Sequence, residues 1–121
     1  PSIDPAAKPA APVVRLRLTF RGEELLVGPN GKATITMGRA DENDVVIKGN
    51  LISRVHARID VARNRFVLVD ESTNGTFIQQ DAGEELYVRR DSAVLTGTGV
   101  ISMGRVAARG TPLAIEYRVE E

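Results

Sequence analysis

Apolar and polar residues alternate in short segments along the chain, and polar or glycine-containing turns separate the segments. In residues 14–20 and again in residues 113–119, every second position is apolar. A period of two places successive side chains on opposite faces of a strand, so both segments are predicted to be half-buried β-strands. The apolar positions of the first segment are Val14, Leu16, Leu18 and Phe20.

Between these two segments, the same alternation or a short apolar run predicts further strands. No stretch of ten residues has the i, i+3, i+4, i+7 spacing of an amphipathic helix. Roughly ten or eleven short strands at intervals of about 8–12 residues are typical of a two-sheet sandwich, so the predicted fold class is an all-β sandwich. The intervening strands are expected at residues 23–27, 33–37, 44–47, 55–61, 66–69, 76–78, 86–88, 94–95 and 100–101.

The pattern makes two detailed predictions. In residues 55–61 the alternation places Val55 on the buried face and His56 on the opposite face. After residue 78, the polar run 79–83 is expected to be a loop, because Gly83 and the residues before it break the apolar pattern.

Three polar segments follow or precede predicted strands, and loops gathered at one end of a sandwich commonly carry function. They are Gly38-Arg39, residues 53–56 and residues 71–76. The guanidinium of Arg39 has a flat fork of donors that matches phosphate oxygens. Hydroxyl and amide groups accompany it in the other two segments, at Ser53, Thr73 and Asn74, so the set suits recognition of a phosphate on a peptide.

Composition narrows the function classes. With 121 residues, of which 42% are hydrophobic, the chain has the size and apolar content of one globular domain. Lys+Arg and Asp+Glu both number 16, so the basic excess that a general nucleic-acid binder needs is missing. Aromatic residues make up 4% and Trp is absent, which also disfavours base stacking.

The chain has no Cys and one His, which excludes disulfides, thiolate zinc sites and multi-histidine metal sites. We expect no metal and no cofactor. Ser53 and His56 could suggest a nucleophile and a base, but the i, i+3 spacing across a loop-to-strand step rarely aligns them, and no acid partner is evident. The chain is therefore predicted not to be an enzyme.

No apolar run approaches 18 residues, and the N-terminal residues lack the basic start and apolar stretch of a signal peptide. We expect a cytoplasmic (intracellular) protein without membrane insertion. Residues 1–12 contain four prolines and several alanines, which favours a semi-extended linker. This linker would join a domain at residues 13–121 to an upstream domain in a larger multidomain protein; an added overhang is the other interpretation.

Gly38-Arg39, Ser53-Arg54-Val55-His56 and Asn74-Gly75-Thr76 together resemble the forkhead-associated (FHA) domain. The resemblance covers residues 14–119. It implies an eleven-stranded β-sandwich, of the type shared by FHA and SMAD domains, with binding loops at one end. It also implies phosphothreonine-peptide binding in protein–protein interaction and signal transduction.

The resemblance assigns roles residue by residue. Arg39 and Ser53 would hold the phosphate, Arg54 would add charge beside it, and Thr73 would contact it from the facing loop. Asn74 would bond the peptide main chain. A small apolar niche for the γ-methyl group would favour Thr over Ser, by about 0.8 kcal/mol. Three residues would support the site structurally: Gly38, His56 and Gly75.

The chain departs from the family pattern at residues 79–83, where many members have a short Asn-Gly hairpin, and at Thr98-Gly99, where a Gly-Asp pair is usual. These loops are expected to help select the residues after the phosphothreonine. The acidic segment containing Asp41, Glu42 and Asp44 is either a solubilising loop or an element that repels acidic peptides.

Two other functions remain open from the sequence. The domain could be a scaffold or oligomerisation unit that uses a sheet face and does not depend on phosphorylation. It could also be an autoregulatory domain that clamps an upstream catalytic partner.

Overall fold

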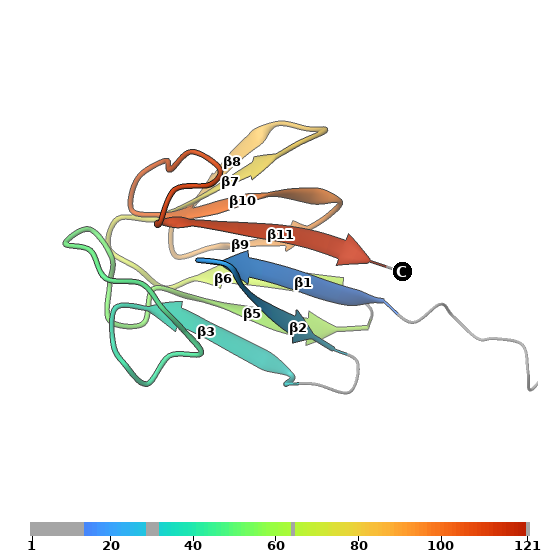
Figure 1. The fold of residues 1–121 in the computed structure, drawn as a ribbon, viewed down its shortest axis with the longest axis horizontal. Coiled ribbons are helices and arrows are strands. Elements are labelled where there is room, and N and C mark those ends of the chain that lie inside the picture. Colours follow the sequence, from blue (N-terminus) through green and yellow to red (C-terminus); the bar gives the residue numbers. More distant parts are fainter. Residues whose placement is uncertain (1–13, 29–31, 64, 121) are drawn as a thin grey trace, which may run out of the picture.

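The computed structural model describes residues 14–28, 32–63 and 65–120, and the predicted linker at residues 1–12 lies outside them. The described chain folds into two β-sheets and contains eleven strands (Figure 1). The prediction of an all-β sandwich is therefore confirmed. The strands are β1 (Arg15–Phe20), β2 (Glu23–Val27), β3 (Thr34–Gly38), β4 (Val45–Val46), β5 (Ala57–Ala62), β6 (Arg65–Asp70), β7 (Thr76–Gln80), β8 (Glu85–Val88), β9 (Ser92–Leu95), β10 (Thr98–Met103) and β11 (Ala114–Glu120).

The six-stranded sheet has the order β2-β1-β11-β10-β7-β8, and the five-stranded sheet has the order β4-β3-β5-β6-β9. Neighbouring strands are antiparallel, except that β3 and β4 are parallel. The first and last strands lie side by side, with Arg15 opposite Glu120. In Figure 1 the end of β11 lies at the opposite end of the molecule from the long loops.

Strand register defines two ends of the sandwich. Ala57 of β5 pairs with both Met37 of β3 and Asp70 of β6, so β3 and β6 finish where β5 begins. Thr76 of β7 pairs with Val88 of β8 at the same end. We call this the loop end, comprising residues 38–44, 48–56, 71–75, 89–91 and 104–113, and the opposite one the far end.

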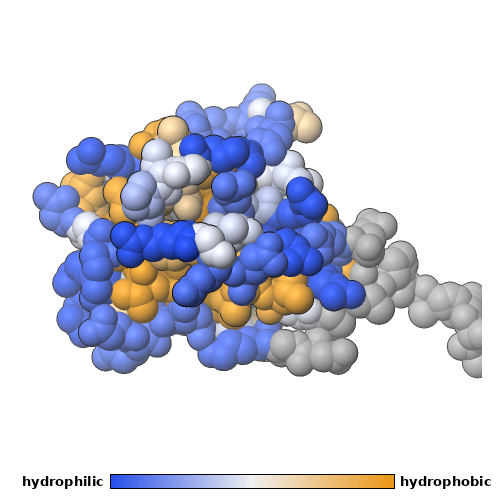
Figure 2. All heavy atoms as spheres, in the orientation of Figure 1, coloured by the Kyte–Doolittle hydropathy of each residue, from blue (hydrophilic) through white to orange (hydrophobic). Residues whose placement is uncertain are grey.

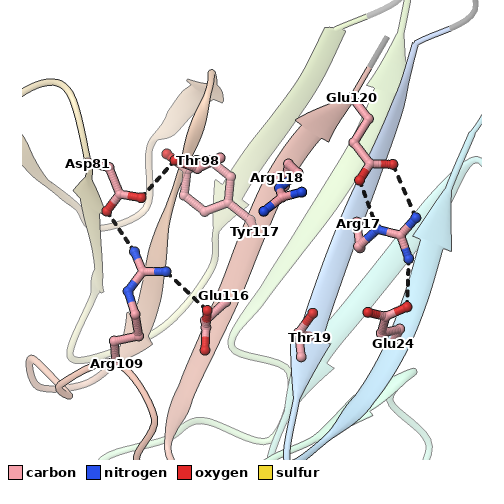
Figure 3. Close-up of a pocket in the computed structure, with 10 residues that line it drawn as sticks. All are labelled: Arg17, Thr19, Glu24, Asp81, Thr98, Arg109, Glu116, Tyr117, Arg118 and Glu120. Atoms are coloured by element: carbon pink, nitrogen blue, oxygen red, sulfur yellow. Dashed lines mark hydrogen bonds and ion pairs between the residues drawn. The ribbon is translucent and has the colours of Figure 1, made fainter.

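The face of the molecule seen in Figure 2 is covered mostly by hydrophilic side chains, with apolar ones visible between them. On the six-stranded sheet, charged side chains of neighbouring strands pair with each other (Figure 3). Arg17 lies between Glu24 and Glu120, with nitrogen–oxygen distances of 2.6 and 2.9 Å. Arg109, in the β10–β11 loop, joins Asp81 of the β7–β8 turn at 2.6 Å and Glu116 of β11 at 3.0 Å.

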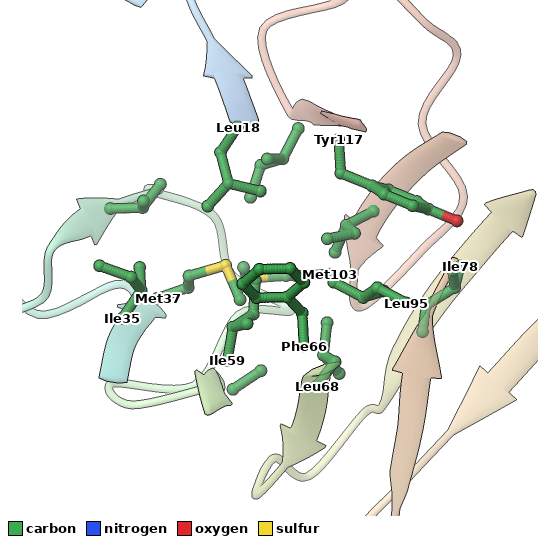
Figure 4. Close-up of a cluster of buried hydrophobic side chains, with 14 of the residues drawn as sticks. Leu18, Ile35, Met37, Ile59, Phe66, Leu68, Ile78, Leu95, Met103 and Tyr117 are labelled. Atoms are coloured by element: carbon green, nitrogen blue, oxygen red, sulfur yellow. The ribbon is translucent and has the colours of Figure 1, made fainter. Parts of the chain in front are cut away.

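The inner faces of both sheets form one apolar core (Figure 4). Alternate residues of each strand point inward, as their period of two requires. Fully burying one such side chain stabilises the fold by about 1.5–3 kcal/mol. Side chains in the middle of this core include Leu18, Ile35, Met37, Ile59, Phe66, Leu68, Ile78, Leu95, Met103 and Tyr117.

The two detailed expectations were wrong. Val55 is 46% exposed and precedes β5, whereas His56 is fully buried. The reversal arises because both ring nitrogens of His56 bond main-chain groups inside the molecule, as described below. Residues 79 and 80 belong to β7, since Gln79 pairs with Val100 and also lies opposite β8, so the β7–β8 turn is shorter than expected.

Candidate functional site

The three polar segments singled out in the sequence meet at the loop end. The Arg39 N–H donates to the carbonyl of Ser53 at 2.9 Å. The Thr73 N–H donates to the Ser53 hydroxyl at 3.2 Å. The Asn74 side-chain amide donates to the carbonyl of Leu51 at 3.0 Å. The segment at residues 51–53 is therefore joined by direct hydrogen bonds to both of the others.

Arg39 presents a guanidinium that is fixed at one atom and open at the others. Its Nε donates to the carbonyl of Ile52 at 3.0 Å, and the residue is exposed. Within residues 14–28, 32–63 and 65–120, its two terminal nitrogens have no acceptor. Arg54 is also exposed, and its side chain makes no hydrogen bond or ion pair in the same ranges. Both cations are thus free to bind an anion.

Asn74 retains binding capacity after its bond to Leu51. A side-chain amide has two N–H donors and a carbonyl acceptor. Only one bond from its nitrogen is present, and its Oδ1 has no donor among the described residues. The hydroxyl of Thr73 is exposed and likewise has no partner in this part of the chain. Their roles as ligands remain predictions.

His56 connects two of the loops from below. Its Nδ1 accepts the Ser53 N–H at 3.0 Å, so Nε2 carries the proton and donates to the carbonyl of Gly75 at 2.7 Å. Burial lowers the pKa of His56, outweighing the opposing effects of the Gly75 bond and the Asp70 carboxylate. The ring is therefore a neutral tie between loops, in agreement with the structural role that the resemblance implies.

Gly38 and Gly75 allow close approaches that a side chain would block. A Cβ at Gly38 would overlap the carbonyl of Arg54. It would also lie 2.8 Å from the main-chain nitrogen of His56. Gly75 has a φ of 87°, and the ring of Tyr87 occupies the space where its Cβ would lie. Both positions require glycine for the loops to meet.

A buried carboxylate organises the β6–β7 loop beneath its exposed residues. Asp70 is 2% exposed. Burial alone would raise the pKa of Asp70, but hydrogen bonds from Thr76, the Arg90 N–H and Ser72 outweigh it and lower that pKa. The Ser72 hydroxyl, in turn, accepts the Gly75 N–H at 2.7 Å. Sequence reasoning missed this network, although an Asp two residues before a Ser is a turn signal that could have indicated it.

Three side chains at the end of β8 hold the same loop by its carbonyls. Each donates to one of three successive carbonyl groups, so the main chain of the β6–β7 loop is fixed along its length. None of the three residues was singled out in the sequence, because only the β7–β8 pairing brings them to this loop. The bonds are Arg90 Nε to Ser72 at 3.3 Å, Arg89 Nε to Thr73 at 2.8 Å and Tyr87 hydroxyl to Asn74 at 3.0 Å.

The β10–β11 loop, and not the turn before β10, lies at the loop end. The Gly104 N–H donates to the carbonyl of Gly75 at 2.9 Å. By contrast, Gln80 pairs with Gly99 at the far end. Residues 79–83 and Thr98-Gly99 thus lie at the opposite end of β7 and β10 from the three candidate-site segments.

Two of the three acidic residues in the segment 41–44 have cationic partners. Asp41 pairs with Lys48 at 2.8 Å, and this contact lowers the pKa of Asp41. Asp44 pairs with Lys32 and accepts the Thr36 N–H at 2.9 Å. Of the two interpretations of this segment, the pairing favours a structural, solubilising loop.

Five arginines of the loop end differ, since none of these five has a carboxylate within 4.0 Å among the residues described, whereas Arg109 is paired. In a chain of zero net charge, this leaves local positive charge unbalanced. These residues are Arg39, Arg54, Arg89, Arg90 and Arg105.

In the described ranges, no group of three His, Cys, Asp or Glu side chains is arranged to hold a metal ion. The same ranges contain no helix with the length and apolar character needed to cross a membrane.

Comparisons with known proteins agree with this architecture. A family model described as FHA domain matches residues 35–104, more than half of the chain. No curated protein matches the chain. All three loop segments that carry the candidate site residues lie inside the matched range.

Several solved structures share the fold. The FHA-1 domain of Mycobacterium tuberculosis Rv1747 is 20% identical, with a TM-score of 0.66, over 91% of this chain and 100% of that one. The FHA domain of an Arabidopsis thaliana hypothetical protein is 26% identical, with a TM-score of 0.62, over 93% and 92%. The N-terminal FHA domain of S. cerevisiae Rad53p, in complex with a phosphothreonine peptide, is 18% identical, with a TM-score of 0.59, over 88% and 91%.

Proposed function

The chain belongs to the FHA domain family, and from that premise we propose that it is a phosphothreonine-peptide-binding module of signalling proteins. The Rad53p domain, which shares its fold, was solved with such a peptide. Arg39 and Ser53 would bind the phosphate, with Arg54 and Thr73 beside them. Asn74 would bond the peptide main chain.

One observation carries the proposal: an unpaired guanidinium is anchored next to a hydroxyl group that already bonds the facing loop. Ser53 receives the Thr73 N–H, and Arg39 is anchored at Nε with its terminal nitrogens open. A phosphate brings about −1.5 to −2 charge and three acceptor oxygens. Preorganised donors lose little conformational freedom on binding, so three charge-assisted bonds would support an affinity of about 1 μM.

Binding without catalysis follows from the position of His56. The Ser53 main-chain N–H, and not its hydroxyl, bonds the ring, and the other ring nitrogen donates to Gly75. His56 therefore offers no free base to activate Ser53 as a nucleophile. This argument supports an interaction module over a hydrolase.

The test is titration with matched peptides. An oriented phosphopeptide library would first supply a sequence that binds, and that peptide would be compared as its phosphothreonine, phosphoserine and unphosphorylated forms. We expect binding of the phosphothreonine form, weaker binding of phosphoserine, and none of the unphosphorylated peptide. Equal affinity for all three forms, or none for any library member, would contradict the proposal.

The phosphorylation-independent scaffold remains the competing function. Sedimentation of the protein without peptide separates the two, because a scaffold that uses a sheet face would self-associate as its concentration rises. A monomer that binds phosphopeptide excludes it.

A further inference from the structure

Arg89 lies beside the candidate phosphate site but is not part of the proposed contact set. It follows β8, is exposed, and donates from Nε to the carbonyl of Thr73 at 2.8 Å. That bond holds the guanidinium next to Thr73, and the N–H of Thr73 in turn donates to the Ser53 hydroxyl. Within the described residues, the terminal nitrogens of Arg89 have no acceptor.

No carboxylate of the described residues forms an ion pair with Arg89, and Asp91, two residues on, accepts the Ser92 N–H at 2.8 Å. Asp70 is buried and accepts bonds from Ser72, Thr76 and the Arg90 N–H. Glu71 pairs with Arg58. A fixed guanidinium whose charge is unpaired favours binding of an external anion, because little ordering is required.

The distance to the candidate phosphate site is short. Only the backbone of Thr73 and two hydrogen bonds, of 3.2 and 2.8 Å, separate the Ser53 hydroxyl from the Arg89 Nε. With standard backbone dimensions the gap is at most about 10 Å. An extended peptide advances about 3.3 Å per residue, so Arg89 is within reach of about three residues on one side of the phosphothreonine.

We propose that Arg89 is a second anion-binding contact, which recognises an acidic or phosphorylated side chain near the phosphothreonine in the same peptide. This inference rests on the proposed function. Two neighbouring side chains brace the same loop but differ from Arg89, and Tyr87 serves as the control for the brace alone. Tyr87 carries no charge, and Arg90, at a φ of 54°, also donates its N–H to Asp70.

The experiment uses one phosphothreonine peptide with neutral flanks and a set in which Glu or phosphoserine replaces single residues at the three positions on either side. For the unmodified protein, we expect substitution at one peptide position to improve affinity. The improvement should be about threefold to fivefold with Glu and about tenfold with phosphoserine. The carboxylate and phosphate arms distinguish the two forms of the ligand. The improvement should shrink as salt is raised.

Variants assign the effect to Arg89. Arg89→Gln keeps a donor for the Thr73 carbonyl but removes the charge, so the improvement from the acidic residue should disappear while the neutral peptide loses about twofold. Arg89→Lys keeps the charge, so this variant should retain part of the affinity improvement from the acidic residue. Tyr87→Phe removes a neighbouring brace, and Arg65→Gln removes a charge at the far end; both should leave the improvement intact.

The outcomes separate the two proposals. If the neutral phosphothreonine peptide binds but no acidic residue improves affinity, or if the improvement survives in Arg89→Gln, the second contact is wrong and the proposed function stands. An equal loss in Tyr87→Phe would show that Arg89 only braces the loop. If no phosphothreonine peptide binds the unmodified protein, both proposals fail.

Discussion

Two regions of this molecule use arginine in opposite ways. On the six-stranded sheet, Arg17 lies between Glu24 and Glu120, so its charge is matched on both sides (Figure 3). At the loop end, Arg39 and Arg89 are held by main-chain carbonyls, which fix a guanidinium without neutralising it. Although the net charge of the chain is zero, some of its arginines are paired with carboxylates and others are not.

The difference teaches where binding can occur. An exposed ion pair contributes little to stability and offers little to a ligand, because its partner must first be displaced. A guanidinium anchored by a neutral carbonyl keeps its full charge and its orientation.

The contrast depends on a loop end that stays folded, so removing its buried carboxylate should have the largest effect. Asp70→Ala would leave donors of Ser72, Thr76 and Arg90 without an acceptor. We expect a loss of about 3 kcal/mol in the free energy of unfolding and loss of phosphopeptide binding. Urea denaturation measures the first, and Asp41→Ala, at an exposed ion pair, is the matched control. Similar midpoints for both variants would contradict the organising role of Asp70.

Removing an open cation should affect binding far more than stability. Arg39→Ala is expected to weaken phosphothreonine-peptide binding by about 100-fold, because charge-assisted bonds to the phosphate are lost. Its thermal midpoint should remain within about 3 °C of the unmodified protein, as the residue is exposed. Calorimetric titration and thermal melts provide both readouts. A large fall in the midpoint would mark Arg39 as structural.

Lowering the pH should reduce the stability that His56 contributes by bonding two loops. Because burial lowers the pKa of His56, the folded state holds fewer protons than the unfolded chain. The stability that His56 contributes is present above its ordinary pKa, about 6.5, and is lost as the pH falls below it toward the folded value. Carboxylates stay ionised between pH 7.5 and 5.5, and the chain has one His, so the assignment is direct.

Thermal melts from pH 7.5 to 5.5 measure this effect, and the NMR shift of the imidazole gives its protonation state. The expected result is a falling midpoint with an imidazole that stays neutral below pH 6.5. A flat midpoint, or a ring that titrates as in a free peptide, would refute the buried tie.

The smallest effect is expected on the sheet face. Arg17→Ala removes both ion pairs with Glu24 and Glu120, yet exposed pairs are screened by water and salt. The thermal midpoint should shift by no more than about 3 °C, and phosphopeptide affinity should not change. An affinity loss comparable to that of Arg39→Ala would erase the distinction between the two regions.

The sequence predicted the strands well, because side-chain alternation follows directly from strand geometry. It failed at Val55 and His56, where hydrogen bonds to two loops override the alternation. The three polar segments of the candidate site were identified, since each follows or precedes a strand.

What could not be predicted depends on strand order and register. The braces from Arg89 and Tyr87 exist because β8 pairs with β7, which no local pattern specifies. For the same reason, Thr98-Gly99 was expected near the site but lies at the far end, opposite Gln80. Sequence identifies the chemistry of a loop more readily than the end of the sandwich that it occupies.

The pairing of Arg15 with Glu120 has a practical consequence. Anything attached before β1 or after β11, such as a fluorophore, a biosensor surface or another polypeptide, departs from the side of the sandwich that faces away from the arginine-rich rim. A label or surface joined at either position would therefore leave the loop end uncovered.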